Sequence, residues 1–218
     1  RVIGYDHAET APRWYSHLYL SNGNLLRESP GYLYLAGGIG GYLDHGRVRQ
    51  GQVEMSARLI SRLHTAGSAR FRQFINIGYQ QGFHRFENEV LTFYKTNLIR
   101  GFDSGEVTGN QRLCLNMETV YFQKKDFYRF NLAFFGFGDL GLIAPEDEPL
   151  FHGRLYSGLG VGLRLHNESL AFKTLQMRLS FYPNHPRDVG FFGFLLNEHT
   201  RQSFYSFQPV APAPRRFE

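Results

Sequence analysis

One arginine and two carboxylates are spaced so that they could form an ion-pair cluster. Arg100 lies in a charged, irregular stretch at about 82–110, and the next two predicted strands carry Glu118 and Asp139 on their polar faces. A guanidinium can bind carboxylates through several charge-assisted hydrogen bonds, and an arginine placed away from water needs such partners. The spacing therefore predicts that Arg100 binds both carboxylates. The alternative is an ordinary, solvated loop arginine.

Other residue types that often do chemistry lack the partners that the chemistry requires. Cys114 has no positioned base in view, so we expect a small interior side chain rather than a nucleophile. The glycines at 37–41 lack the Lys-Ser/Thr of a phosphate-binding loop. The acidic run at 146–148 could bind calcium, but a solvated loop explains it better. The histidines are dispersed without ligand spacing. We therefore expect no metal, no cofactor and no catalytic residue, and we expect that the chain is not an enzyme.

The composition is that of a β protein and excludes several other classes. The chain has 218 residues, of which 24 are Gly and 16% are aromatic, with 21 Phe and 13 Tyr. Aromatic residues are enriched in strands. No run approaches the roughly 20 apolar residues of a spanning helix, and a single cysteine cannot form an internal disulfide. The net charge is +5, but the basic residues are scattered, so nucleic acid is not an expected partner.

Alternation of apolar and polar residues predicts long strands. At 112–123, one parity is apolar, from Leu113 to Tyr121, and the other is polar, from Arg112 to Glu118. The same pattern recurs, least cleanly in the last segment, at 14–20, 33–43, 53–63, 71–80, 128–139, 155–165, 175–181 and 201–207. We expect about nine strands of about 9–13 residues, which is well above the usual mean of about 5–6.

Two architectures explain such strands. A soluble sandwich buries the apolar face, whereas a transmembrane barrel turns that face to lipid and closes on itself because hydrocarbon leaves no partner for free backbone groups. Strand length, aromatic residues near strand ends and glycines on the polar parity favour the barrel. The predicted fold class is therefore all-β: a transmembrane antiparallel β-barrel over 1–208, with a lumen-directed loop at about 82–110, followed by a Pro-rich tail at 209–218.

Two short motifs and one glutamate resemble features of the BamA/TamA-like outer-membrane barrel superfamily, the bacterial surface antigen domain. The segment 98–102, Leu-Ile-Arg-Gly-Phe, is similar to the loop motif Arg-Gly-Phe/Tyr of that family. The segment 137–141, Phe-Gly-Asp-Leu-Gly, is similar to its strand motif Phe-x-Asp-x-Gly. Glu118 falls where the family carries a strand glutamate. The resemblance spans about 31–207 and is nearest to short members from Bacteroidota.

The resemblance implies a site and a place in the barrel. Arg100 would lie on a loop that folds into the lumen, where it contacts Asp139 and Glu118 and holds the loop against the wall. This role is structural or conformational, not chemical. The family barrel has about 16 strands, so the chain would form the C-terminal part of one. The implied site residues are Arg100, Gly101, Phe102, Glu118 and Asp139, with Phe137 and Gly141 from the strand motif.

The resemblance also implies a function. The chain would sit in the outer membrane of a bacterium and take part in the insertion, assembly or translocation of proteins there, without chemistry of its own. Its expected partners are outer-membrane lipid and other outer-membrane or periplasmic proteins. Two alternatives stay open. The barrel could anchor a patatin-like or phosphoesterase hydrolase domain encoded upstream, or it could be a non-catalytic accessory subunit of an outer-membrane complex.

Overall fold

The computed structural model describes residues 2–6, 13–26, 31–44, 47–93, 98–123, 131–166 and 174–198. These residues form strands and their connections, with one short 3-10 helix, η1 (Leu150–His152). None of their helices has the length and apolar character needed to cross a bilayer. Some sequence predictions fall outside the described residues: the start of the strand at 128–139, the strand candidate at 201–207 and the tail at 209–218.

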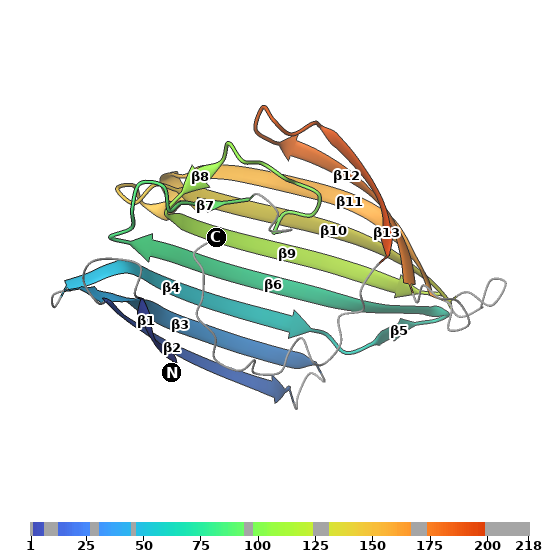
Figure 1. Cartoon of the computed structure of the whole chain (residues 1–218). Coiled ribbons are helices and arrows are strands. Elements are labelled where there is room, and N and C mark those ends of the chain that lie inside the picture. Colours follow the sequence, from blue (N-terminus) through green and yellow to red (C-terminus); the bar gives the residue numbers. More distant parts are fainter. Residues whose placement is uncertain are drawn as a thin grey trace.

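The strands form one antiparallel sheet in which chain neighbours pair. Its strands in order are β1 (Val2–Asp6), β2 (Arg13–Leu25), β3 (Tyr32–Asp44), β4 (Arg47–Ile60), β6 (Ala69–Phe83), β9 (Gln111–Phe122), β10 (Asn131–Ala144), β11 (Arg154–His166), β12 (Thr174–Asn184) and β13 (Phe192–Glu198). Short β5 (His64–Ala66) pairs with β6. Separately, β7 (Leu91–Thr92) pairs with β8 (Thr108–Gly109). Figure 1 shows a curved sheet, with the β7–β8 segment beside β9, β10 and β11.

The all-β, antiparallel architecture predicted from the sequence is confirmed. The strands are long, reaching 14 residues in β4 and β10 and 15 in β6. The described sheet is open: β1 and β13 are its edges, and no pairing between them closes the part of the chain that the structure describes. The structure thus establishes a curved antiparallel sheet and not a closed barrel.

The two faces of the sheet differ in polarity. We call the face that carries Asn116, Glu118 and Asp139 the inner face and the opposite one the outer face. Buried polar side chains on the inner face include His17, Gln52, Arg112, Asp139, Thr174, Gln176, Arg178 and Ser180. Exposed apolar side chains on the outer face include Leu18, Leu20, Leu35, Ile39, Met55, Ile77, Met117, Phe134, Leu140, Leu159, Val161, Leu179, Phe194 and Leu196. The polar parity therefore points inward and the apolar parity points outward.

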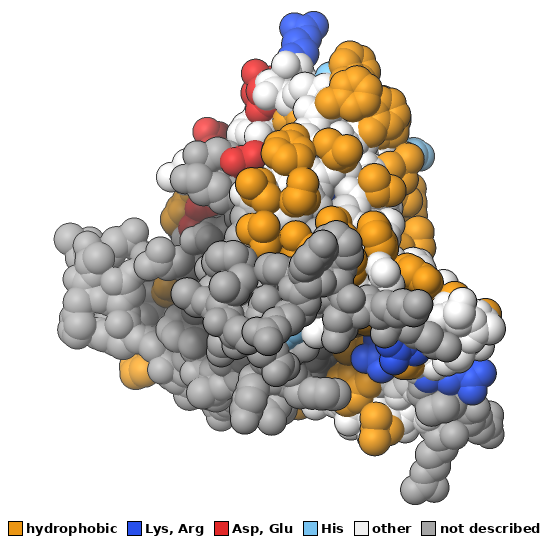
Figure 2. Space-filling model, turned by 90° about the vertical axis from the view of Figure 1, so that its right-hand side faces the viewer, with side chains coloured by type: hydrophobic (Ala, Val, Ile, Leu, Met, Phe, Trp, Pro, Cys, Tyr) orange, Lys and Arg blue, Asp and Glu red, His pale blue; other side chains and the backbone are white. Residues whose placement is uncertain are grey.

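This polarity is the reverse of a soluble sandwich, which buries its apolar face against a second sheet. Figure 2 views the side of the molecule that carries β12 and β13, where hydrophobic side chains gather over the visible surface of the sheet. Val161, near the middle of β11, is 60% exposed. Large contiguous apolar surfaces of this kind mark places where a protein meets something other than water.

Candidate functional site

The connection between β6 and β9 packs on the inner face. We call its described residues, 84–93 and 98–110, the inner segment. Its apolar side chains form a buried cluster with side chains of β9, β10, β11 and β12. Members of this cluster are Leu91, Phe93, Ile99, Phe102, Val107, Cys114, Ile143, Tyr156, Tyr182 and Val189. The ring centroid of Phe102 lies 5.6 Å from that of Tyr156 and 5.9 Å from that of Tyr182. Burial of these side chains stabilises the inner segment against the sheet.

Arg100 binds Asp139 through both its main chain and its side chain. The Arg100 backbone N–H donates to Oδ2 of Asp139 at 2.9 Å, its Nε donates to Oδ2 at 3.0 Å, and its Nη2 donates to Oδ1 at 2.8 Å. Asn116 Nδ2 donates to the same Oδ1 at 2.9 Å. The Asp139 side chain is 0% exposed. These donors offset the cost of burying a carboxylate, which would be large if it were unpaired.

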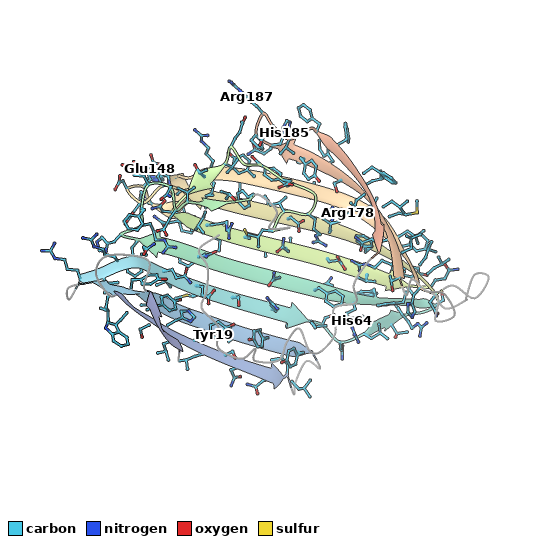
Figure 3. All side chains as sticks on the ribbon, in the orientation of Figure 1. Tyr19, His64, Glu148, Arg178, His185 and Arg187 are labelled. Carbon is cyan, nitrogen blue, oxygen red and sulfur yellow. The ribbon has the colours of Figure 1, made fainter. Side chains whose placement is uncertain are left out.

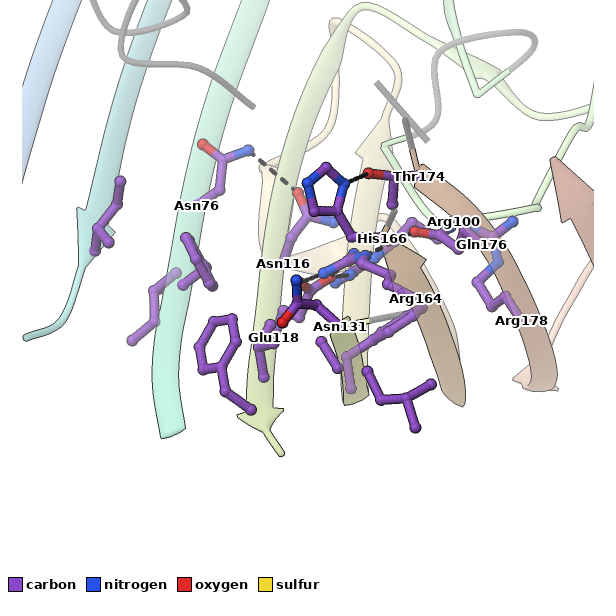
Figure 4. Close-up of a pocket in the computed structure, with 18 of the residues that line it drawn as sticks. Asn76, Arg100, Asn116, Glu118, Asn131, Arg164, His166, Thr174, Gln176 and Arg178 are labelled. Carbon is purple, nitrogen blue, oxygen red and sulfur yellow. Dashed lines mark hydrogen bonds and ion pairs between the residues drawn. The ribbon is translucent and has the colours of Figure 1, made fainter. Parts of the chain in front are cut away.

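Glu118 is shared by two arginines. Its Oε2 accepts from Arg100 Nη1 at 2.5 Å, and its two oxygens accept from Arg164 Nη1 and Nη2 at 2.7 and 3.0 Å. Arg164 Nε also donates to Gln176 Oε1 at 2.9 Å. Figure 4 shows these side chains meeting from β9, β11, β12 and the inner segment. We call Arg100, Glu118, Asp139 and Arg164 the ion-pair cluster.

Two aromatic rings of β10 lie under the guanidinium groups. The Cζ of Arg100 is 4.3 Å from the ring centroid of Phe137, and the Cζ of Arg164 is 4.1 Å from that of Phe135. At these distances a cation is attracted to the ring face. Phe137, which the sequence singled out only as a motif residue, is therefore a packing surface for Arg100.

Gly101 and Tyr182 hold the turn next to Arg100. Gly101 has a φ of +76°, which residues with a side chain rarely adopt. A Cβ atom there would lie 2.5 Å from the Tyr182 hydroxyl and 2.7 Å from Arg178 Nη2. The Tyr182 hydroxyl donates to the Arg100 carbonyl at 2.9 Å. Any larger residue at Gly101 would therefore disturb both the turn and its hydrogen bond.

Gly141 lets the inner segment approach the backbone of β10. A Cβ atom at Gly141 would lie 2.7 Å from Ile99 Cδ1 and 2.7 Å from Phe93 Cζ. Both of those side chains are fully buried. By contrast, a Cβ atom at Gly78, on the inner face of β6, would meet nothing within 4 Å.

We expect Gly141→Ala to loosen the inner segment and Gly78→Ala to leave it unchanged. The added methyl group at Gly141 must displace Ile99 and Phe93, at a cost of about 1–3 kcal/mol. Limited proteolysis checks this, because cleavage within 84–110 should become faster only in Gly141→Ala. Equal cleavage rates in the two variants would contradict close packing at Gly141.

Further contacts fix both ends of the inner segment. Ser104 Oγ and the Gly105 backbone N–H donate to Asp188, between β12 and β13, at 2.9 and 3.2 Å. Glu146, between β10 and η1, accepts from Asn110 Nδ2 at 3.1 Å and from the His84 backbone N–H at 3.3 Å. Figure 3 shows Glu148, His185 and Arg187 at the same edge of the molecule as these connections. One end of the sheet therefore carries a network that ties several connections together.

The sequence did not identify Arg164, Tyr182 or Asp188 as partners of the inner segment, and it indicated Glu146 only as part of an acidic run that could bind calcium. Arg164 carried a usable signal, because it lies on the polar parity of its strand, as Glu118 does on its own. The contacts of Tyr182, Asp188 and Glu146 depend on tertiary packing.

Cys114 is buried in the cluster beneath the inner segment. Among the described residues, no group of three or more His, Cys, Asp or Glu side chains could hold a metal ion.

Comparisons of the chain with models of known families, with curated proteins and with solved structures found no match. The site is thus characterised by its own geometry. That geometry consists of ion pairs, hydrogen bonds and close packing which join one long connection to the inner face of the sheet.

Proposed function

We propose that this chain is part of an outer-membrane β-barrel of the BamA-like superfamily, which takes part in the insertion, assembly or translocation of proteins at that membrane. The observation that carries the proposal is the reversed polarity of the sheet. Its outer face exposes apolar side chains from β2 to β13, while its inner face buries arginine, aspartate and glutamine. A sheet with an apolar exterior and a polar interior suits hydrocarbon outside and water inside.

If the sheet spans a membrane, its open edges need further strands. In hydrocarbon, an unpaired backbone N–H or C=O costs several kcal/mol, so a spanning sheet must close. The described edges, β1 and β13, do not pair with each other. We propose that further strands complete the barrel, and the resemblance of the motifs suggests a total of about 16.

The ion-pair cluster is the feature that we connect with the proposed function. In the family that the motifs resemble, an arginine on a loop contacts a strand aspartate and a strand glutamate. Here Arg100 makes these contacts with Asp139 and Glu118. Under the proposal, the inner segment occupies the lumen and the cluster sets its position on the wall. Protein insertion or translocation would then depend on an inner segment that is held at a fixed position in the lumen.

The only tryptophan provides the test. Trp14 lies on the outer face of β2 and is 54% exposed. In bilayers whose acyl chains carry bromine, we expect strong quenching of Trp14 fluorescence, because a spanning strand places this ring against lipid. Iodide in the water should quench it weakly. Quenching by iodide and none by brominated lipid would contradict the proposal.

A further inference from the structure

A cavity of about 950 Å³ lies on the inner face beside the ion-pair cluster. This volume is within the range of sites that hold small ligands. Among the described residues, the charged side chains that line it are Arg58, Arg70, Arg100, Arg164, Arg178 and Glu118. Figure 4 shows Arg100, Arg164 and Arg178 on the same side of this cavity. Arginines therefore outnumber carboxylates on its wall.

The carboxylates next to the cavity are already occupied. Asp139 binds Arg100 through both of its oxygens. Glu118 binds Arg100 through one oxygen and Arg164 through both. Neither carboxylate makes an ion pair with Arg178 in the described part of the chain. The cluster therefore balances Arg100 and Arg164 but leaves the charge of Arg178 without a carboxylate.

Arg178 is a deeply placed cation whose charged neighbours are Arg100, Arg164 and the Asp139 carboxylate, which is already bound to Arg100. It is 7% exposed, and its Nε is buried with no hydrogen-bond partner in the described structure. Its Cζ is 5.8 Å from the centroid of Phe137, the ring that also contacts Arg100. On the neighbouring strand, Gly162 pairs with Arg178 and Arg164 pairs with Gln176, so Arg164 is two residues away on the same face. A buried charge in such a setting is costly without a counter-charge.

A second arginine of the cavity wall, Arg70, also has a buried nitrogen that lacks a hydrogen-bond partner among the described residues. This nitrogen is the Nε of Arg70, at the start of β6. Guanidinium groups bind planar or tetrahedral oxyanions through paired hydrogen bonds. Amide groups of Asn131 and Gln176 also line the cavity and could bind the polar remainder of a ligand.

We infer that this cavity binds a small ligand that carries phosphate or carboxylate groups, with Arg178 as its principal charged contact. Cavity size favours a small molecule, and the unbalanced guanidinium groups favour an oxyanion. The inference goes beyond the proposed membrane function. It depends only on the inner face and would hold in any setting in which this sheet folds.

Calorimetric titration of the purified chain with inorganic pyrophosphate and with citrate tests the inference. We expect at least one of the two to bind with a dissociation constant in about the millimolar range or tighter. Arg178→Gln should weaken that binding by about tenfold or more, because it removes a charged donor. Arg62→Gln is the matched control, since Arg62 is exposed between β4 and β5, and should bind as the wild type does. Binding of pyrophosphate alone assigns phosphate as the ligand group, and binding of citrate alone assigns carboxylate.

Two results would overturn the inference. One is that folded wild-type protein binds neither anion, and the other is that Arg178→Gln binds as tightly as the wild type. Resistance of the inner segment to protease shows that each variant is folded. The membrane proposal is tested separately, by the quenching of Trp14 fluorescence in brominated lipid. Anion binding by a chain whose Trp14 does not touch lipid would refute that proposal and support this inference.

Discussion

Arg100→Ala is expected to lower the free energy of unfolding by about 3–5 kcal/mol, because it removes one partner of a buried ion pair and leaves the other. Asp139 has no exposure to water and would keep only main-chain and amide donors. Glu118 would keep Arg164 as its remaining cation. Unfolding in urea measures the loss, and faster proteolysis within 84–110 should accompany it.

The control for this variant is Arg187→Ala. Arg187 is exposed between β12 and β13, so its removal should change stability by no more than about 0.5 kcal/mol. Combining Arg100→Ala with Asp139→Asn should cost less than the sum of the single changes, because the second change removes the charge that the first leaves unpaired. Wild-type stability and protease resistance in Arg100→Ala would show that Arg100 does not hold the inner segment.

For the ion-pair cluster, the sequence predicts those features that depend only on the alternation of residues within one strand. Side-chain parity within a strand is enough to assign Glu118 and Asp139 to one face, and their charge suggests an arginine partner. Parity does not give the depth of a residue along neighbouring strands. Glu118 and Arg164 are separated by β10 and meet only through the register of three strands. That register is set by packing over the whole sheet, so parity assigns Arg164 to the inner face but spacing alone does not place it beside Glu118.

Two strands on the main path of the sheet escape prediction for different reasons. β1 has five residues, too few for an alternating pattern to stand out. β13 reads Phe-Gly-Phe-Leu-Leu-Asn-Glu, and Leu195 and Leu196 place apolar residues on both parities. Its strand conformation follows from pairing with β12. The polarity of the faces is also a tertiary property, because alternation alone fits both an apolar interior and an apolar exterior.

Val161→Arg is expected to destabilise the protein in a bilayer by about 2–4 kcal/mol, the cost of placing arginine near the midplane on a lipid-facing strand. Val161 lies near the middle of β11, and Leu159 and Leu179 on the same outer face are also exposed. At an equally exposed position in water, the same change would be nearly neutral. The size of the loss therefore reports what the outer face contacts.

Phe151→Arg is the matched control, because Phe151 is apolar and 82% exposed but lies in η1, outside the strands. Its cost near the membrane surface should be about 0–1 kcal/mol. The most direct measurement of the central claim is the difference in unfolding free energy between Val161→Arg and Phe151→Arg in lipid bilayers. A loss that is larger for Val161→Arg by about 2 kcal/mol or more is the predicted result. Equal, small losses in the two variants would show that the outer face of the sheet does not contact lipid.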